Sequence, residues 1–271
     1  MERDIKALEK KAKELRRDVL NMIWNAKSGH LGGSFSEIEI LTALFHGEMN
    51  FSGKNMNDPE RDRFVLSKGH TAPALYVNLA DVGCFEKERL MNSYRICNGM
   101  LQGHPCITTP GVEICGGSLG IGLSVANGMA AGNRYQGYKG RVYCMIGDGD
   151  IDEGQIWEAA ATGAALKLDN VCAFVDVNGL QNDASTKEVK DMMDISAKWK
   201  AFGWYVQEID GHDFKQIFDA LDKARAHKGQ PSVIVAHTIK GKGVSFMENI
   251  VEWHGKTPNE AEYKAALAEL S

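Results

Sequence analysis

Apolar residues in the first part of the chain recur at helical spacing. Between residues 5 and 24 they fall on one face of a helix, with charged residues opposite, and this pattern predicts an amphipathic helix. Its apolar positions are Ile5, Leu8, Leu15, Val19, Leu20, Ile23 and Trp24. Residues 36–45 predict a second helix, whose Ser36-Glu37-Ile38-Glu39 start resembles a capping box.

Five short apolar runs further along the chain predict β-strands without an exposed face. They lie at residues 64–66, 142–146, 171–175, 204–209 and 233–236. Helical patterns separate or follow the later runs, at residues 155–166, 194–202, 214–226 and 259–270. This alternation predicts an α/β fold with a mostly parallel sheet covered by helices on both faces. The 271 residues suit one such domain, spanning residues 1–271.

Composition narrows the classes of protein that fit. The net charge is −5 and the basic residues are scattered, so no nucleic-acid partner is expected. No apolar run reaches the roughly 20 residues of a membrane span, and the charged N-terminus does not resemble a secretory signal. The six cysteines form no C-x-x-C pair, and we expect buried, reduced thiols in a cytoplasmic protein.

Residues 146–154 place four acids and three glycines directly after the predicted strand 142–146. Asp148 follows this strand, and Asn178 follows the next one, thirty residues later. That separation accommodates one helix and its two turns. Because neighbouring parallel strands end at the same edge of a sheet, we expect Asp148 and Asn178 to converge there.

These side chains suit a hard cation. Asp148 offers a carboxylate oxygen, Asn178 an amide oxygen, and the following turn a backbone carbonyl such as that of Leu180. Magnesium is usually completed by water and phosphate oxygens instead of a full protein cage. Gly147 and Gly149 lack a Cβ, which leaves room for a diphosphate beside the start of the next helix.

Three other interpretations compete for the acidic loop. An EF-hand would need glycine at Glu153 and glutamate at Ala159, and no G-x-G-x-x-G fingerprint opens the following helix. A plain acidic surface turn explains the loop alone. It does not explain why Asn178 and its turn follow at the spacing that convergence requires.

The loop together with Val177-Asn-Gly-Leu-Gln-Asn-Asp183 resembles a thiamine diphosphate-binding motif. Further segments resemble the transketolase family, in that family's order and over nearly the whole chain. They are residues 25–34, 62–76, 101–105, 116–122, 208–213 and 237–255. The resemblance implies the diphosphate-binding (PP-type) domain of a thiamine diphosphate enzyme with Mg²⁺, for which Ca²⁺ or Mn²⁺ would be substitutes.

The resemblance also implies roles for single residues. Asp148, Asn178 and the Leu180 carbonyl match metal ligands. The cofactor contacts implied for the diphosphate and the aminopyrimidine are His70, Gly117, Leu119, Gly147, Gly149, Asn178 and His254.

His30, His104 and His254 match histidines near the reactive carbon in that family. Glu153 matches an acid that links two active sites across a dimer. Eight histidines occur in the chain, and five of them neighbour a glycine in these matched segments: His30, His70, His104, His254 and His212. We expect His212, in Asp210-Gly-His-Asp213, to have a structural or loop-orienting role. The chain departs from the family's pattern at Ser118, Asn182 and Lys240, so the resemblance does not identify the sugar substrate.

Only the first domain of a transketolase is matched. The resemblance therefore implies an N-terminal subunit that transfers a two-carbon ketol unit from a ketose, expected to be phosphorylated, to an aldose. A partner subunit would supply the pyrimidine-binding and C-terminal domains and the activating glutamate, in an α₂β₂ assembly. The alternatives are an alpha-type subunit of a 2-oxo acid dehydrogenase, a deoxyxylulose phosphate synthase relative, and a non-catalytic homologue. Pentose phosphates, a sulfosugar or a branched-chain sugar phosphate all fit as substrates.

Overall fold

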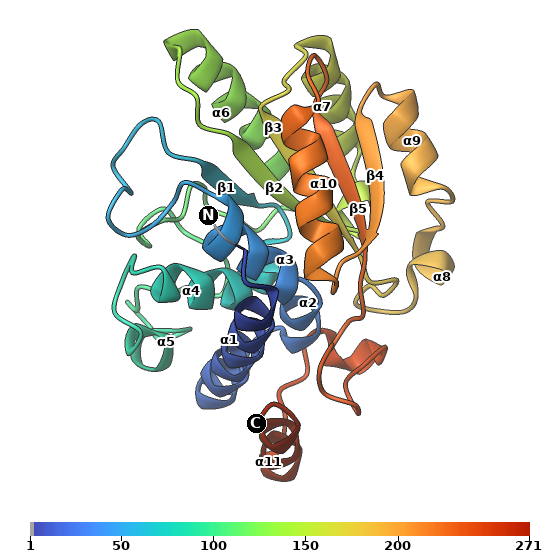
Figure 1. Cartoon of the computed structure of the whole chain (residues 1–271). Helices are drawn as coiled ribbons and strands as arrows, with labels where there is room; N and C mark the ends of the chain where they lie inside the picture. Colours follow the sequence, from blue (N-terminus) through green and yellow to red (C-terminus); the bar gives the residue numbers. More distant parts are fainter. Residues whose placement is uncertain (1–2) are drawn as a thin grey trace.

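A five-stranded parallel sheet forms the centre of the computed structural model, which describes residues 3–271 (Figure 1). The strands lie in the order β1-β2-β3-β5-β4, and every neighbouring pair is parallel. Their bounds are β1 Arg63–Leu66, β2 Val142–Gly147, β3 Val171–Val177, β4 Tyr205–Asp210 and β5 Ser232–His237. All five predicted strands are therefore present within one residue of their expected starts.

The predicted helices are also present, and they correspond to α1, α3, α7, α9, α10 and α11. The α-helices are α1 Ile5–Ala26, α2 Leu31–Ser36, α3 Ile38–Ala43, α4 Ala72–Asp81, α5 Arg89–Asn92, α6 Gly122–Gln136, α7 Gly154–Ala165, α8 Thr186–Lys190, α9 Ile195–Ala201, α10 Phe214–Ala226 and α11 Glu260–Glu269. The sequence did not predict the longer helices α4 and α6, nor the short helices α2, α5 and α8. Within residues 3–271, no helix combines the length and the apolar character needed to cross a bilayer.

Strand side chains alternate between two cores, which lie on opposite faces of the sheet. Tyr143 and Met145 of β2 pack with α1, α3, α4 and α10, whereas Val142 and Cys144 pack with α6, α7 and α9. Both faces are thus covered, as the continuous apolar strands predicted. The sheet is held rigidly between these layers, and its strand ends provide fixed positions for side chains.

The predicted capping box at Ser36 is wrong. A bend at Glu37 separates α2 from α3, and Glu37 makes no side-chain cap. The Ser36 hydroxyl instead lies 2.7 Å from the buried carboxylate of Asp176, and Glu39 pairs with Arg16 and His212. The side chains that a surface helix would use for its own cap therefore bond to buried partners on other elements.

The cysteines are only partly as expected. All six are free, but just three (Cys84, Cys144 and Cys172) are buried. Cys97 and Cys115 are exposed, and Cys106 is half-buried. These three belong to the irregular segment between α5 and α6, where no apolar periodicity marked a core position.

The carboxyl ends of β1, β2, β3 and β5 meet at one edge of the sheet. Gly147 at the end of β2 is in register with Asp176 of β3, so Asp148 and Asn178 follow at neighbouring positions. Lys68 follows β1, and Thr238 follows β5 with its amide bonded to the Val177 carbonyl. The residues that follow these four strands therefore lie side by side along one edge of the sheet.

Candidate active site

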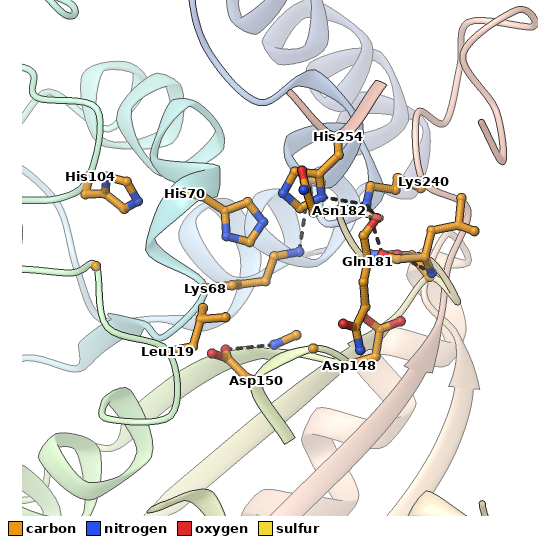
Figure 2. Close-up of a pocket in the computed structure, with 16 residues that line it drawn as sticks. Lys68, His70, His104, Leu119, Asp148, Asp150, Gln181, Asn182, Lys240 and His254 are labelled. Carbon is orange, nitrogen blue, oxygen red and sulfur yellow. Dashed lines mark hydrogen bonds between the residues drawn. The ribbon is translucent and has the colours of Figure 1, made fainter. Parts of the chain in front are cut away.

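A cavity of about 300 Å³ opens at this edge of the sheet (Figure 2). Ten of the twelve residues for which the sequence implied a catalytic, cofactor-binding or metal-binding role line it: His70, His104, Gly117, Leu119, Gly147, Asp148, Gly149, Asn178, Leu180 and His254. Figure 2 shows the histidines His70 and His254 facing the acids Asp148 and Asp150 across the cavity. His30 and Glu153 do not line it.

Asp148 is tied to the turn that follows β3. Its Oδ2 accepts a hydrogen bond from the Gly179 amide at 2.7 Å, and its own amide donates to the Asp176 carbonyl at 3.1 Å. In the same turn, the Asn178 side-chain oxygen accepts from the Leu180 amide. Burial, and then the nearby Asp176 carboxylate, raise the pKa of Asp148 to about 7. The surrounding protein therefore disfavours the ionised form of Asp148, which a bound cation would stabilise.

The oxygens around Asp148 fit a hard divalent cation. Among residues 3–271, no three His, Cys, Asp or Glu side chains are grouped to hold a metal, so amide and carbonyl oxygens must complete the set. Asn178 and the Leu180 carbonyl provide such oxygens beside the cavity. The Leu180 carbonyl already accepts from a cationic group, the Lys240 ammonium, at 2.9 Å. The donor types match magnesium or calcium better than a thiolate-binding metal.

A buried hydrogen-bond network centred on Asp176 supports these oxygens from below. The Asp176 carboxylate is fully buried and contacts Lys68, Ser36, Thr238 and Asn178. Burial alone would raise the pKa of Asp176, but the Lys68 ammonium, together with the hydroxyls of Thr238 and Ser36, outweighs it and holds that pKa below its usual value. Asp176 is therefore ionised, and it ties the ends of β1, β3 and β5 together.

Three imidazoles cluster opposite Asp148: His70 and His254 line the cavity wall, and His30 lies behind them. The His70 and His254 rings stack with centroids 5.0 Å apart, and the His30 ring meets their edges at 5.2 and 5.5 Å. Burial, followed by nearby positive groups, lowers the pKa of His30 to about 4 and that of His254 to about 3. Burial likewise lowers the pKa of His70 well below its usual value. All three are therefore neutral at pH 7, so each has one N–H donor and one acceptor nitrogen.

Lys240 fixes the orientation of His254. Its ammonium lies 2.8 Å from His254 Nδ1 and also donates to the carbonyls of Leu180 and Gln181. Because Nδ1 accepts this hydrogen bond, the ring proton resides on Nε2. Burial lowers the pKa of Lys240 to about 8, which leaves it mainly charged at pH 7. Lys240, which stands where the family often has an aliphatic residue, therefore makes polar contacts in the cavity.

Asp150 holds the glycine-rich segment 116–122 against the strand end. Its two carboxylate oxygens accept from the amides of Gly120 and Gly147 at 3.1 and 3.0 Å. This brings Gly117 and Leu119 to the cavity wall. Asn182 also lines the cavity, whereas Ser118 does not.

His212 orients the segment that carries Lys240. Its Nδ1 lies 3.0 Å from Glu39 Oε2, and its Nε2 accepts from the Ile239 amide at 2.9 Å. The ring therefore connects α3 to residue 239, one position before Lys240. The expectation of a loop-orienting role agrees with this geometry.

Glu153 lies at the exposed N-terminal boundary of α7, beside Gly120.

The cavity residues that the sequence did not single out are Gly33, Lys68, Asp150 and Gln181. Lys68 was detectable in principle, because a lysine two residues after a buried strand needs a carboxylate partner if it is itself buried. The role of Asp150 depends on a contact with residue 120, for which the sequence carries no signal.

Fold and cavity together define an α/β enzyme domain whose site lies at the carboxyl edge of a parallel sheet. Residues 8–270 match the family model described as the thiamine diphosphate-binding domain of transketolase. The chain is 43% identical to the 6-deoxy-6-sulfo-D-fructose transketolase subunit of Clostridium sp. (strain MSTE9), over 97% of this chain and 96% of that subunit. It is 41% identical to an apulose-4-phosphate transketolase subunit of Actinobacillus succinogenes, over 97% and 95% of the two chains.

Solved structures agree. The transketolase of Campylobacter jejuni superposes with a TM-score of 0.91 at 32% identity, covering 99% of this chain and 43% of that one. The chain therefore belongs to the transketolase family and corresponds to the thiamine diphosphate-binding part of those enzymes. It spans less than half the length of that transketolase chain.

Proposed function

We propose that this chain is the diphosphate-binding subunit of a two-subunit transketolase. The enzyme would transfer a two-carbon ketol unit from a ketose to an aldose, using thiamine diphosphate and Mg²⁺. The observation that carries the proposal is a single cavity in which Asp148, Asn178 and Leu180 face a cluster of neutral histidines. The relatives that match over nearly their whole length are themselves named transketolase subunits.

Asp148, Asn178 and the Leu180 carbonyl would hold the cation, and His70, Gly147 and Gly149 would contact the diphosphate. Gly117 and Leu119 would contact the aminopyrimidine. Two features support this division. Burial and Asp176 outweigh the positive charges of Lys68 and Lys240 at the Asp148 carboxylate, and a Cβ on Gly149 would meet only the Gln181 side chain, so the space beside Gly149 is open.

When bound, thiamine diphosphate supplies a carbon nucleophile and an electron sink beside a ketose carbonyl. This chain's residues would position the sugar and move its protons. The Nε2–H of His254, set by Lys240, would donate to a carbonyl or hydroxyl oxygen of the sugar. His30, next to it, would act on the same oxygen, and His104 on a donor hydroxyl.

The remaining domains are proposed to lie on a partner subunit, in an α₂β₂ assembly. That subunit would carry the pyrimidine-binding domain and the activating glutamate. Glu153 is exposed in the isolated chain, so its proposed role in linking two active sites depends on contact with a second copy.

Mixing experiments test this function. The chain and the partner polypeptide are purified separately and assayed for ketol transfer with Mg²⁺ and thiamine diphosphate. Activity is expected only in the mixture, and full activity from the lone chain would contradict the proposal. Decarboxylation of a 2-oxo acid without ketol transfer would favour the alternative enzyme class. A screen of pentose phosphates, sulfosugars and branched-chain sugar phosphates on the mixture would identify the substrates.

A further inference from the structure

Two cysteines face each other at the base of the loop 107–114, beside the cavity. The Cys115 thiol lies 3.5 Å from the Cys106 sulfur, and the Gly116 amide donates to the Pro105 carbonyl at 2.8 Å. This backbone bond holds residues 105 and 116 together, so Cys106 and Cys115, the next residue on each segment, lie side by side. A disulfide requires the two sulfurs to close from 3.5 Å to about 2.05 Å.

The two thiols are accessible and differ in reactivity. Cys115 is exposed and Cys106 is half-buried, unlike the fully enclosed Cys144 and Cys172. Hydrogen bonds from Thr108 and from the Cys115 thiol lower the pKa of Cys106. Cys106 therefore has more thiolate character than an ordinary thiol, with a resolving thiol in contact.

We propose that Cys106 and Cys115 form a reversible thiol–disulfide pair that reacts with hydroperoxides. The Cys106 thiolate attacks the peroxide, forms a sulfenic acid and releases hydroxide, which takes up the thiol proton as water. The Cys115 thiol then attacks the sulfenic sulfur, which forms the S–S bond and releases a second water. In total, two thiols and one H₂O₂ give one disulfide and two waters, and an organic hydroperoxide would give one alcohol and one water. A dithiol reductant reverses the change and becomes oxidised itself.

The bond would act on the cavity through tightly packed backbone. A Cβ built on Gly116 would lie 3.0 Å from Pro105 Cδ and 3.3 Å from Gly69 Cα. The Pro105 ring and the Gly69 backbone therefore pack directly against Gly116. His104 lies two residues before Cys106, Gly117 lies two residues after Cys115, and His70 follows Gly69. Drawing Cys106 and Cys115 together therefore shifts the segments that carry these cavity residues.

Peptide mapping of the full chain tests the pair directly, without reference to cofactor or sugar. After reduction and treatment with H₂O₂, we expect linked peptides containing Cys106 and Cys115, with the loss of two hydrogens and reversal by dithiothreitol. Cys97 is a matched control, because it is an exposed cysteine of the same segment. Cys97→Ser should form the disulfide at the wild-type rate, whereas Cys106→Ser and Cys115→Ser should not form it. Oxidation of Cys97 with no linked 106–115 peptide would overturn the proposal.

The effect on the cavity rests on the proposed function and needs a second measurement. Thiamine diphosphate with Mg²⁺ is titrated into oxidised and reduced Cys97→Ser chain, combined with the partner subunit. We expect oxidation to weaken binding at least threefold, reversibly, and to have no effect in the Cys97→Ser, Cys106→Ser double variant. Equal affinity in both states would refute the link to the cavity. A reduced complex that fails to bind the cofactor would instead refute the proposed function, and leave the mapped disulfide in place.

Discussion

Asp148 at the end of β2 accepts a hydrogen bond from the Gly179 amide in the turn after β3, at 2.7 Å. The segments that follow β2 and β3 are thereby joined through the carboxylate that is proposed to bind the cation. Removing this side chain would change both the charge of the cavity and the position of the Asn178 turn. Variants that separate these two effects are therefore the most informative.

Gly149→Ala is expected to leave the fold intact and to impair cofactor binding. An added Cβ would lie 3.8 Å from the Gln181 side chain, and the backbone φ of −74° suits alanine. The free energy of unfolding should therefore change by less than about 1 kcal/mol. The affinity of the reconstituted complex for thiamine diphosphate should fall at least about tenfold, about 1.4 kcal/mol, because the methyl occupies cavity space.

Gly154→Ala is the matched control for this substitution. Gly154 begins α7, and a Cβ there would meet no atom within 4 Å. Its cofactor affinity should equal that of the wild type. Undiminished affinity in Gly149→Ala, measured by calorimetry, would show that the diphosphate does not lie over residue 149.

Lys240→Met should raise the pKa of His254. Burial lowers that pKa most, and the Lys240 charge is the next cause. Without the ammonium, the imidazolium form becomes less unfavourable, and the ring loses the contact that fixes its Nε2 tautomer. Titration of the histidine resonances by NMR should show the upward shift. In the reconstituted enzyme kcat should fall at least about tenfold, since an acid–base group is misaligned.

Lys256→Met serves as the control, because Lys256 lies close to His254 in the chain but pairs with Glu262 at the surface. The pKa of His254 should not move in this variant. An unchanged His254 titration in Lys240→Met would contradict the assigned contact.

Glu39→Gln should destabilise the chain in a pH-dependent manner. Burial alone would raise the pKa of Glu39, but Arg16 and His212 outweigh it and lower the pKa from 4.5 to about 2. A carboxylate with a depressed folded-state pKa contributes its stability fully above pH 4.5 and loses it as the pH falls toward 2. The variant should therefore lose about 3 kcal/mol at neutral pH, and progressively less below pH 4.5.

Urea unfolding at pH 7, 5 and 3.5 measures this difference. Glu260→Gln is the control, because its ion pair with Lys264 is 71% exposed on both sides and should be worth less than about 1 kcal/mol. The difference in unfolding free energy between Glu39→Gln and the wild type should become smaller at low pH. A difference that stays constant would contradict the depressed pKa of Glu39.

The sheet was predictable because its strands are continuous apolar runs bounded by turns. The helices α4 and α6 were missed for two different physical reasons. Residues 72–80 of α4 are all buried, so no polar face marks the helical period. In α6 the buried positions include Gly122, Asn127 and Asn133, and the two asparagines donate to the Ala159 and Gly140 carbonyls. A hydrophobicity pattern registers these asparagines as exposed.

Part of the site was predictable for a similar reason. Asp148 and Asn178 follow adjacent strands, so parallel topology alone brings them to one edge. Lys240 and Asp150 could not be assigned in this way. Their partners are His254, which ends a single turn of 3-10 helix, and Gly120, which lies in a turn, so their positions depend on packing and not on a periodic pattern.

Cofactor titration of Asp148→Ala tests the central claim most directly, with Mg²⁺ present and the chain bound to its partner subunit. The affinity for thiamine diphosphate is expected to fall at least about 100-fold, or about 2.7 kcal/mol, when this cation ligand is removed. Asp148→Asn, which keeps an acceptor for the Gly179 amide, should show a similar loss with the fold preserved. Asp219→Ala, at an exposed position of α10, should bind as the wild type does. Wild-type affinity in both Asp148 variants would contradict the account.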